Sequence, residues 1–341
     1  MPKSIFDNTK TAFKLKSDSV LERAYFLFKL ISKEPLVRIG TAATKFVLNL
    51  NLPVEGLIRT TVLDHFCGGV NEKDCMPVVQ GLSEAGVFSV LDYSVEGKEE
   101  DAQFEATTKK VIELTAFAKE KNSMPFSVFK PTGLGRFNIW KSVTSKESLT
   151  KSQEKEWQDI MNRYHSICST ASKYDVSLLI DAEEYAMQGA ADELCEQMMQ
   201  EYNTEKAIVF NTLQCYRWDR LDYLKQQHAT AREKGYKLGF KVVRGAYMEK
   251  ENDYAEAGNY LSPICASKSE TDENFNGVMR YILDNLDDIS LFLGTHNESS
   301  SFLAMEIMQK KGIAKNDARV WFGQLYGMSD HITFNIASEG Y

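Results

Sequence analysis

Hydrophobic positions along the chain fall into two alternating kinds of segment. Short runs rich in β-branched and aromatic residues end in polar or small residues, and longer stretches with apolar residues at helical spacing follow them. The short runs predict seven strands: VFSVLDY (87–93), FSVFKPT (126–132), SLLIDAE (177–183), AIVFNTLQ (207–214), LGFKVVRG (238–245), SLFLGTH (290–296) and VWFGQLYG (320–327). The longer stretches predict helices between them, at residues 98–120, 153–174, 271–286 and 299–312.

Strand and helix alternate at intervals of about 30 to 50 residues, which indicates a parallel sheet because each parallel pairing needs a crossover connection. Such a sheet is either closed into a barrel or open and doubly wound. No G-x-G-x-x-G dinucleotide fingerprint follows the first run, and GLG at 133–135 lacks the third glycine, which favours the barrel. Polar residues stand near the ends of the runs: Asp92, Lys130, Asp181, Asn211, Lys241, Thr295, His296 and Gln324. We therefore expect an α/β fold of the (βα)8-barrel type, with these residues converging on one mouth.

The two ends of the chain differ from the barrel pattern. After the seventh run only SDHITFNIASEGY (329–341) remains, which reads as a helix, so we expect the eighth βα unit to be missing and the barrel of residues 86–341 to be truncated. Residues 1–85 contain no convincing strand and predict a helical arm. Within it, SVLERAYFLFKLIS (19–32) predicts an amphipathic helix with Ser19 as its N-cap.

Composition and charge argue against several classes of function. A formal net charge of -8 and a pI near 5.4, with scattered basic residues, argue against nucleic-acid binding. The cysteines form no C-x-x-C pair, which argues against a zinc ribbon or a disulfide framework. No apolar run reaches the roughly 18 residues of a membrane span. The segments 21–31 and 45–58 are apolar and lightly charged, and they leave peripheral membrane contact open beside ordinary burial.

Lys130 and Asp181 lie near the ends of two successive expected strands, so they are candidates for a partly buried ion pair at the barrel mouth. Such a pair adds little to stability, because desolvation offsets much of the Coulomb attraction. A role in a functional site is therefore the stronger interpretation. The alternative for Asp181 is a helix N-cap, a frequent use of aspartate.

The stretch KVVRGAYMEKE (241–251) ends a strand with two cations, Lys241 and Arg244, beside the small residues Gly245 and Ala246. This combination suits a phosphate or a flat anionic ring, and the alternative is a charged strand edge with a tight turn. Tyr247 is either a core aromatic or a cover for a bound ring.

Two further stretches contain residues that can bind ligands. His296 is a cap, a ligand contact or a general base, and no histidine or acidic neighbour stands at metal-ligand spacing, so we expect no metal site. The acidic run SKSETDENF (267–275) lacks the features of an EF-hand and is expected to be a solvated loop.

The chain closely resembles the proline dehydrogenase (proline oxidase) family in six stretches, which stand in this order: FSVFKPTGLGRF, LLIDAEE, VFNTLQCY, KVVRGAYMEKE, GTHN and FGQLYGMSDH. A further stretch, DYSVEG (92–97), resembles the first strand of the family. The similarity runs from about residue 86 to the end. It implies a (βα)8 barrel that binds FAD and oxidises L-proline to Δ1-pyrroline-5-carboxylate. Hydride would pass to flavin N5 and electrons to a membrane quinone.

The resemblance also implies roles for individual residues. Asp181 and Lys241 would be catalytic, with Lys241 near flavin N5, and Lys130, Tyr247 and Glu96 would bind the substrate. The expected cofactor contacts are Ala182, Asn211, Gln214, Arg244, Gly245, Ala246, Thr295 and His296. The family's adjacent pair of arginines for the substrate carboxylate is missing here, so Glu96 would lack its partner.

The resemblance implies a cytoplasmic or membrane-peripheral location in a bacterium, with the mitochondrial inner membrane as the alternative. Because the arginine pair is missing, a catalytically silent flavin-binding barrel is one rival function. Another flavin barrel oxidoreductase of the methylenetetrahydrofolate reductase type is a second rival. A flavin-free aldolase-like barrel is a third.

Overall fold

The computed structural model of the protein describes residues 5–33, 64–93 and 99–341. The chain divides into two compact units. One comprises residues 1–87 with 324–339, and the other comprises residues 88–323 with 340 and 341.

The N-terminal unit is built from helices in its described part. They are η1 (Ile5–Asp7), α1 (Thr9–Ala12), α2 (Asp18–Ile31), α5 (Asp64–Phe66), α6 (Glu72–Glu84) and α15 (Asp330–Ser338). Helix α15 packs on the first residues of the chain: the Asn335 amide donates to the Asn8 carbonyl (3.4 Å), and Lys16 pairs with Asp330 (3.8 Å). The expected helical character is therefore confirmed for the described residues, whereas the boundary at residue 85 stays a prediction.

Helix α2 begins two residues earlier than expected, and its N-cap is Ser17 rather than Ser19. Ser17 has the extended backbone that an N-cap adopts, whereas Ser19 lies in the first helical turn. The second apolar segment considered for membrane contact, residues 45–58, lies outside the described residues. Within the described ranges, no helix combines the length and the apolar character needed to cross a bilayer.

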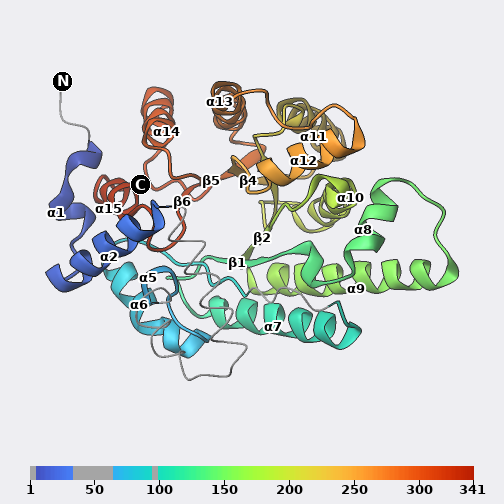
Figure 1. The fold of residues 1–341 in the computed structure, drawn as a ribbon, viewed down its shortest axis with the longest axis horizontal. Coiled ribbons are helices and arrows are strands. Elements are labelled where there is room, and N and C mark those ends of the chain that lie inside the picture. Colours follow the sequence, from blue (N-terminus) through green and yellow to red (C-terminus); the bar gives the residue numbers. More distant parts are fainter. Residues whose placement is uncertain (1–4, 34–63, 94–98) are drawn as a thin grey trace. The chain divides into compact units, whose positions relative to one another are not determined.

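The second unit holds a sheet of six parallel strands joined by helices (Figure 1). The strands, in spatial and chain order, are β1 (Phe126–Phe129), β2 (Ser177–Ile180), β3 (Val209–Gln214), β4 (Leu238–Val243), β5 (Ile289–Gly294) and β6 (Val320–Gly323). The helices are α7 (Asp101–Lys119), η3 (Pro131–Gly133), α8 (Phe137–Thr144), α9 (Lys151–Tyr174), α10 (Tyr185–Tyr202), α11 (Arg220–Lys234), α12 (Met248–Gly258), α13 (Lys268–Asp284) and α14 (Glu298–Lys311). Six of the seven expected strands and all four expected helices are confirmed.

The sheet is curled. In a flat sheet β1 and β6 would lie about 24 Å apart, because neighbouring strands are spaced by about 4.8 Å. The rings of Phe126 on β1 and Trp321 on β6 instead meet edge to face, with centroids 5.1 Å apart. The strands therefore wrap around a common interior, as in part of a (βα)8 barrel. The expected fold class is confirmed.

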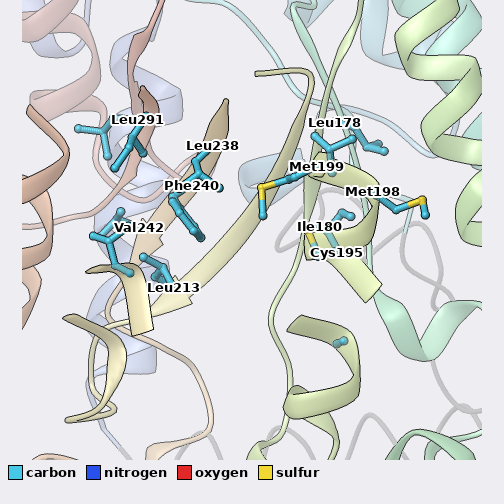
Figure 2. Close-up of a cluster of buried hydrophobic side chains, with 14 of the residues drawn as sticks. Leu178, Ile180, Cys195, Met198, Met199, Leu213, Leu238, Phe240, Val242 and Leu291 are labelled. Atoms are coloured by element: carbon cyan, nitrogen blue, oxygen red, sulfur yellow. The ribbon is translucent and has the colours of Figure 1, made fainter. Parts of the chain in front are cut away.

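Side chains alternate between the two faces of this sheet. On β2, Leu178 and Ile180 point outward into the layer shared with the helices, whereas Leu179 points inward. Figure 2 shows the outer layer, in which Leu178 of β2 and Phe240 of β4 lie in one cluster with Met199 of α10. Helices thus cover the outer face, and burial on both faces explains why the strands read as nearly continuous apolar runs.

The interior is filled mainly by aromatic rings. Its buried members are Phe126, Val128, Leu179, Ala207 and Phe210, with Val90, Phe292 and Trp321 packed against them. A Cβ added to Gly239 on β4 would lie 2.7 Å from the ring of Phe210, so this glycine makes room for an interior aromatic.

Residues 87–93 form no strand, contrary to expectation. Ser89 N–H donates to the Ser123 carbonyl (2.8 Å) in the loop before β1, and Val90 packs on the interior cluster. A strand needs a repeated ladder of such bonds, so β-branched composition was not sufficient here.

Residues 267–275 form no solvated loop, which corrects a second expectation. They are the N-cap and first turns of α13: the Ser267 hydroxyl accepts the Glu270 N–H, and Phe275 is buried in the outer layer. A capping serine and one buried aromatic outweigh the acidic composition of this stretch.

Candidate active site

Three charged side chains meet on the inner face of the curled sheet. Lys130 directly follows β1, Asp181 directly follows β2, and Lys241 lies on β4. Their strand neighbours, such as Phe129 and Ile180, belong to the outer layer, so alternation turns the charged groups inward. The ion pair expected between Lys130 and Asp181 is confirmed.

The Asp181 carboxylate bridges the two ammonium groups. Its Oδ2 lies 3.3 Å from Lys130 Nζ, and its Oδ1 lies 2.5 Å from Lys241 Nζ. The side chains are between 16% and 30% exposed, so the cluster is partly desolvated and still open to solvent. Because a partly buried pair gains little stability, this arrangement favours a functional role.

Lys130 is held as a cation by its surroundings. Burial by itself lowers the pKa of Lys130, but the negative charges of Asp181 and Asp92 outweigh burial, and the pKa is raised above its usual value. Asp92 thus acts on the cluster, as expected for a residue of the mouth, although its segment forms no strand.

Glu183 is a buried carboxyl group that the sequence did not reveal as part of the site. Its Oε2 accepts the Thr132 N–H (2.8 Å), and its Oε1 accepts the Thr132 hydroxyl (2.6 Å). Burial raises the pKa of Glu183, and the bonds from Thr132 oppose that rise. Glu183 therefore ties the loop that carries Lys130 to the loop that carries Asp181. The only sequence signal was the second acid of DAEE, which resembles a solvated residue.

Arg244 points away from the interior toward α13 and α14. Its Nε donates to Asp272 Oδ1 (2.8 Å), its Nη1 to the Thr295 hydroxyl (2.9 Å) and its Nη2 to the Ser300 hydroxyl (3.1 Å). The guanidinium lies over the Phe275 ring, 4.3 Å from its centroid. Arg244 and Thr295 are thus brought together as expected for one site. Asp272 was missed because its segment was expected to be a solvated loop.

Gly245 and Ala246 leave exposed backbone after β4. Gly245 has φ of 129°, and a Cβ added there would overlap the ring of Tyr216, so only glycine fits. Tyr247 follows as the half-buried N-cap residue of α12. Burial and the negative charge of Glu183 raise the pKa of Tyr247, and the positive charge of Lys130 opposes this rise.

Gln214 and Ala182 also meet, because the Gln214 amide donates to the Ala182 carbonyl (3.4 Å). Asn211 differs from them. Asn211 lies on the outer face of β3, where its buried amide donates to Asp192 Oδ1 (3.0 Å) and the Tyr223 hydroxyl (3.3 Å) of the covering helices. The expected position of Asn211 at the mouth is therefore wrong. It joins β3 to the helices behind it.

His296 is exposed and follows Thr295 after β5, and Gln324 belongs to the N-terminal unit. Glu96 lies outside the described residues.

Two surface hollows lined by described residues lie away from the charged cluster. The larger, about 290 Å³, is lined by residues 283–288, Lys311, Ile313 and Arg319, which include the connections that enter β5 and β6. In barrel enzymes the active site lies at the opposite end, where the strands finish. The charged cluster is therefore the better candidate.

A curled parallel sheet with charged side chains where its strands finish defines a (βα)8-type barrel of the enzyme class. The family model described as proline dehydrogenase matches residues 75–341. The chain belongs to the proline dehydrogenase family, which confirms the family and the enzyme class indicated by the sequence motifs.

Individual relatives agree with this assignment. The chain is 32% identical to the carbapenem antibiotics biosynthesis protein CarD of Pectobacterium carotovorum subsp. carotovorum, over 84% of this chain and 74% of that protein. It is 27% identical to the mitochondrial proline dehydrogenase 1 of Arabidopsis thaliana, over 99% of this chain and 76% of that protein.

Solved structures support the fold. The proline utilization A protein (PutA) of Bdellovibrio bacteriovorus, inactivated by N-propargylglycine, matches with a TM-score of 0.74 at 19% identity. The match covers all of this chain and 37% of that protein. This likeness concerns the fold, and the chain spans little more than a third of the length of the solved protein.

Proposed function

We propose that the protein is an FAD-dependent proline dehydrogenase that oxidises L-proline to Δ1-pyrroline-5-carboxylate. Membership of the family supports proline as the substrate. The observation that carries the proposal is the Lys130–Asp181–Lys241 cluster where the strands finish. In this reaction C5 of the ring loses a hydride and the ring nitrogen loses a proton, so that a C=N bond forms.

The chemistry of the residues present fits a flavin. Lys241 presents an ammonium group on the inner face, and Gly245 and Ala246 leave exposed backbone without large side chains after the same strand. The groups that would hold FAD are Ala182, Gln214, Arg244, Gly245, Ala246, Thr295 and His296. When bound, FAD supplies the acceptor for the hydride and its electron pair.

The residues of the cluster have different roles in the reaction. Lys241 is a cation placed in advance where the reaction leaves negative charge, and such preorganised charge is a large part of enzyme catalysis. Asp181 fixes the ammonium groups of Lys241 and Lys130 at once. Lys130 and Glu96 would contact the substrate, and Tyr247 would offer ring surface to the apolar side of proline.

The proposal is tested by the absorption spectrum of the purified protein before and after L-proline is added without oxygen. We expect a flavin spectrum that bleaches with proline. A flavin band that persists with excess proline would support a catalytically silent flavin-binding barrel. Bleaching by 5-methyltetrahydrofolate, the reduced product of methylenetetrahydrofolate, but not by proline would support an oxidoreductase of that type. A colourless protein would support an aldolase-like barrel.

The similarity to the carbapenem biosynthesis protein makes the choice of ring substrate a separate test. The kcat/KM for L-proline is compared with the values for hydroxyproline and for other substituted prolines. Proline dehydrogenase activity predicts the highest value for L-proline. A higher value for a substituted ring would point to a biosynthetic role.

We further propose a quinone as the electron acceptor, with a cytoplasmic or membrane-peripheral location. The exposed Tyr25 and Phe26 of α2, 70% and 62% exposed, support peripheral contact because aromatic side chains favour the membrane interface. Proline-dependent reduction of a soluble quinone tests the acceptor. Co-sedimentation with lipid vesicles, with and without Tyr25→Ser and Phe26→Ser, tests the contact.

A further inference from the structure

The segment 181–185 (DAEEY) joins several neighbouring parts of the chain through successive residues. Asp181 binds Lys130 and Lys241, Glu183 binds Thr132, Glu184 binds Lys250 (2.8 Å), and the Tyr185 N–H donates to Glu251 Oε1 (2.8 Å). The last two bonds both reach the first turn of α12. The segment that carries the central carboxylate of the site is therefore fastened to the helix that begins after Tyr247 (Figure 1).

Glu251 is an unusual acid on α12. Glu249 and Asp253 of the same helix are exposed, whereas Glu251 is 1% exposed. Burial of a carboxylate costs free energy unless hydrogen bonds compensate it, and here the Tyr185 N–H supplies one. The backbone N–H of Glu251 donates to the Tyr247 carbonyl (2.9 Å) as an ordinary bond of the first helical turn, so the side chain of Glu251 ties Tyr185 to the turn that begins at Tyr247.

The neighbouring pair Lys250–Glu184 cannot replace this connection. The Lys250 side chain is 46% exposed, and exposed pairs contribute little because solvent screens them. Another cation lies on the buried side: the Arg217 guanidinium is 4.7 Å from the centroid of the Tyr185 ring. The buried bond between Glu251 and Tyr185 is thus the contact best able to fix the start of α12.

We propose that Glu251 is a positioning residue of the active site. It fixes the start of α12 to segment 181–185 and so holds Tyr247, the N-cap residue of α12, in place relative to the segment that carries Asp181. The inference rests on the proposed function, because the place of Tyr247 matters for turnover only if the ring substrate binds there.

A double-mutant cycle in the full-length, flavin-loaded protein tests this role. Glu251→Ala is expected to raise the KM for L-proline about tenfold and to change kcat less than about threefold, as loss of substrate positioning predicts. Glu251→Gln keeps an oxygen that accepts the Tyr185 N–H, so its KM should stay within about twofold of the parent value. In a Tyr247→Ala background, Glu251→Ala should change KM less than about twofold, because coupled residues are not additive.

Asp253→Ala, which removes an exposed acid from the same helix, is the matched control and should leave KM and kcat unchanged. Glu251→Asp keeps the charge but shortens the side chain, so it gives the same test if the alanine variant fails to fold. An unchanged KM in Glu251→Asp and Glu251→Ala would overturn the inference, as would an equal tenfold effect with and without Tyr247. A parent protein that does not oxidise proline would instead refute the proposed function, and the inference with it.

Discussion

Asp181 Oδ1 lies 2.5 Å from Lys241 Nζ, although Asp181 directly follows β2 and Lys241 lies on β4, with β3 between the two strands. In a flat sheet these strands would stand about 9.6 Å apart, at about 4.8 Å per strand. The curl turns both side chains toward a common interior, where they meet over β3. The cluster therefore depends on the curvature of the sheet as well as on its residues.

Asp181→Ala should lower kcat/KM for proline at least about 100-fold, because both ammonium groups lose the carboxylate that fixes them. The melting temperature should change by only a few degrees, because the cluster is open to solvent and contributes little to folding. Steady-state kinetics and thermal melts measure the two effects. Lys206→Ala, which breaks the exposed pair with Asp175, is the control and should alter neither. A large loss of stability would remove the argument for a functional cluster.

The rate of proline oxidation should depend more on the charge of residue 241 than on the shape of its side chain. Lys241→Met removes the cation and should lower kcat about 100-fold, whereas Lys241→Arg keeps the charge and should stay within about tenfold of the parent. Single-turnover reduction of the bound flavin by proline measures the chemical step. Equal losses in the two variants would show that the charge is not what matters.

Phe126→Ala should lower the free energy of unfolding by about 3 to 5 kcal/mol, the usual cost of removing a large aromatic from a packed core. Its ring touches those of Phe210, Phe292 and Trp321 in the interior. Urea unfolding measures the change. Phe302→Ala removes a ring that is 44% exposed and should cost much less. Similar costs at both positions would contradict a packed interior.

Asp219 should make the protein sensitive to acid. Burial alone would raise the pKa of Asp219, but bonds from Arg220 and Arg217 outweigh it and lower the pKa from 3.8 to about 2. The stability from this carboxylate is complete above pH 3.8 and is lost as the pH falls through about 2. The stability difference between the parent and Asp219→Asn should therefore shrink over this interval in urea titrations. A difference that does not vary with pH would rule out the linkage.

The sequence was most informative where a polar residue ends an apolar run. Strands buried on both faces must be apolar along most of their length, so Lys130, Asp181 and Lys241 stood out at or near the ends of theirs. Because both faces of these strands are buried, apolar and polar residues do not alternate along them, and the sequence does not show which face a residue occupies. Asn211 was therefore expected at the mouth, although it faces the helices.

The missed residues share another property. Asp272 lies in an acidic stretch that looks like a solvated loop, and Glu251 lies in one that looks like a solvated helix face. Each is bonded to a partner far away in the chain, Asp272 to Arg244 and Glu251 to Tyr185. Local patterns cannot select such partners, because the tertiary fold brings them together. Glu183 likewise has a distant partner in the chain, because it accepts the Thr132 N–H.

The edge-to-face contact of Phe126 and Trp321 joins residues separated by most of the strand-forming region. Contacts between distant parts of a chain form slowly, because the loss of loop entropy precedes the gain in binding energy. The aromatic interior should consequently be among the last parts to assemble during refolding. The fluorescence of Trp321, whose ring contacts Phe126, offers an intrinsic reporter of this late assembly of the interior.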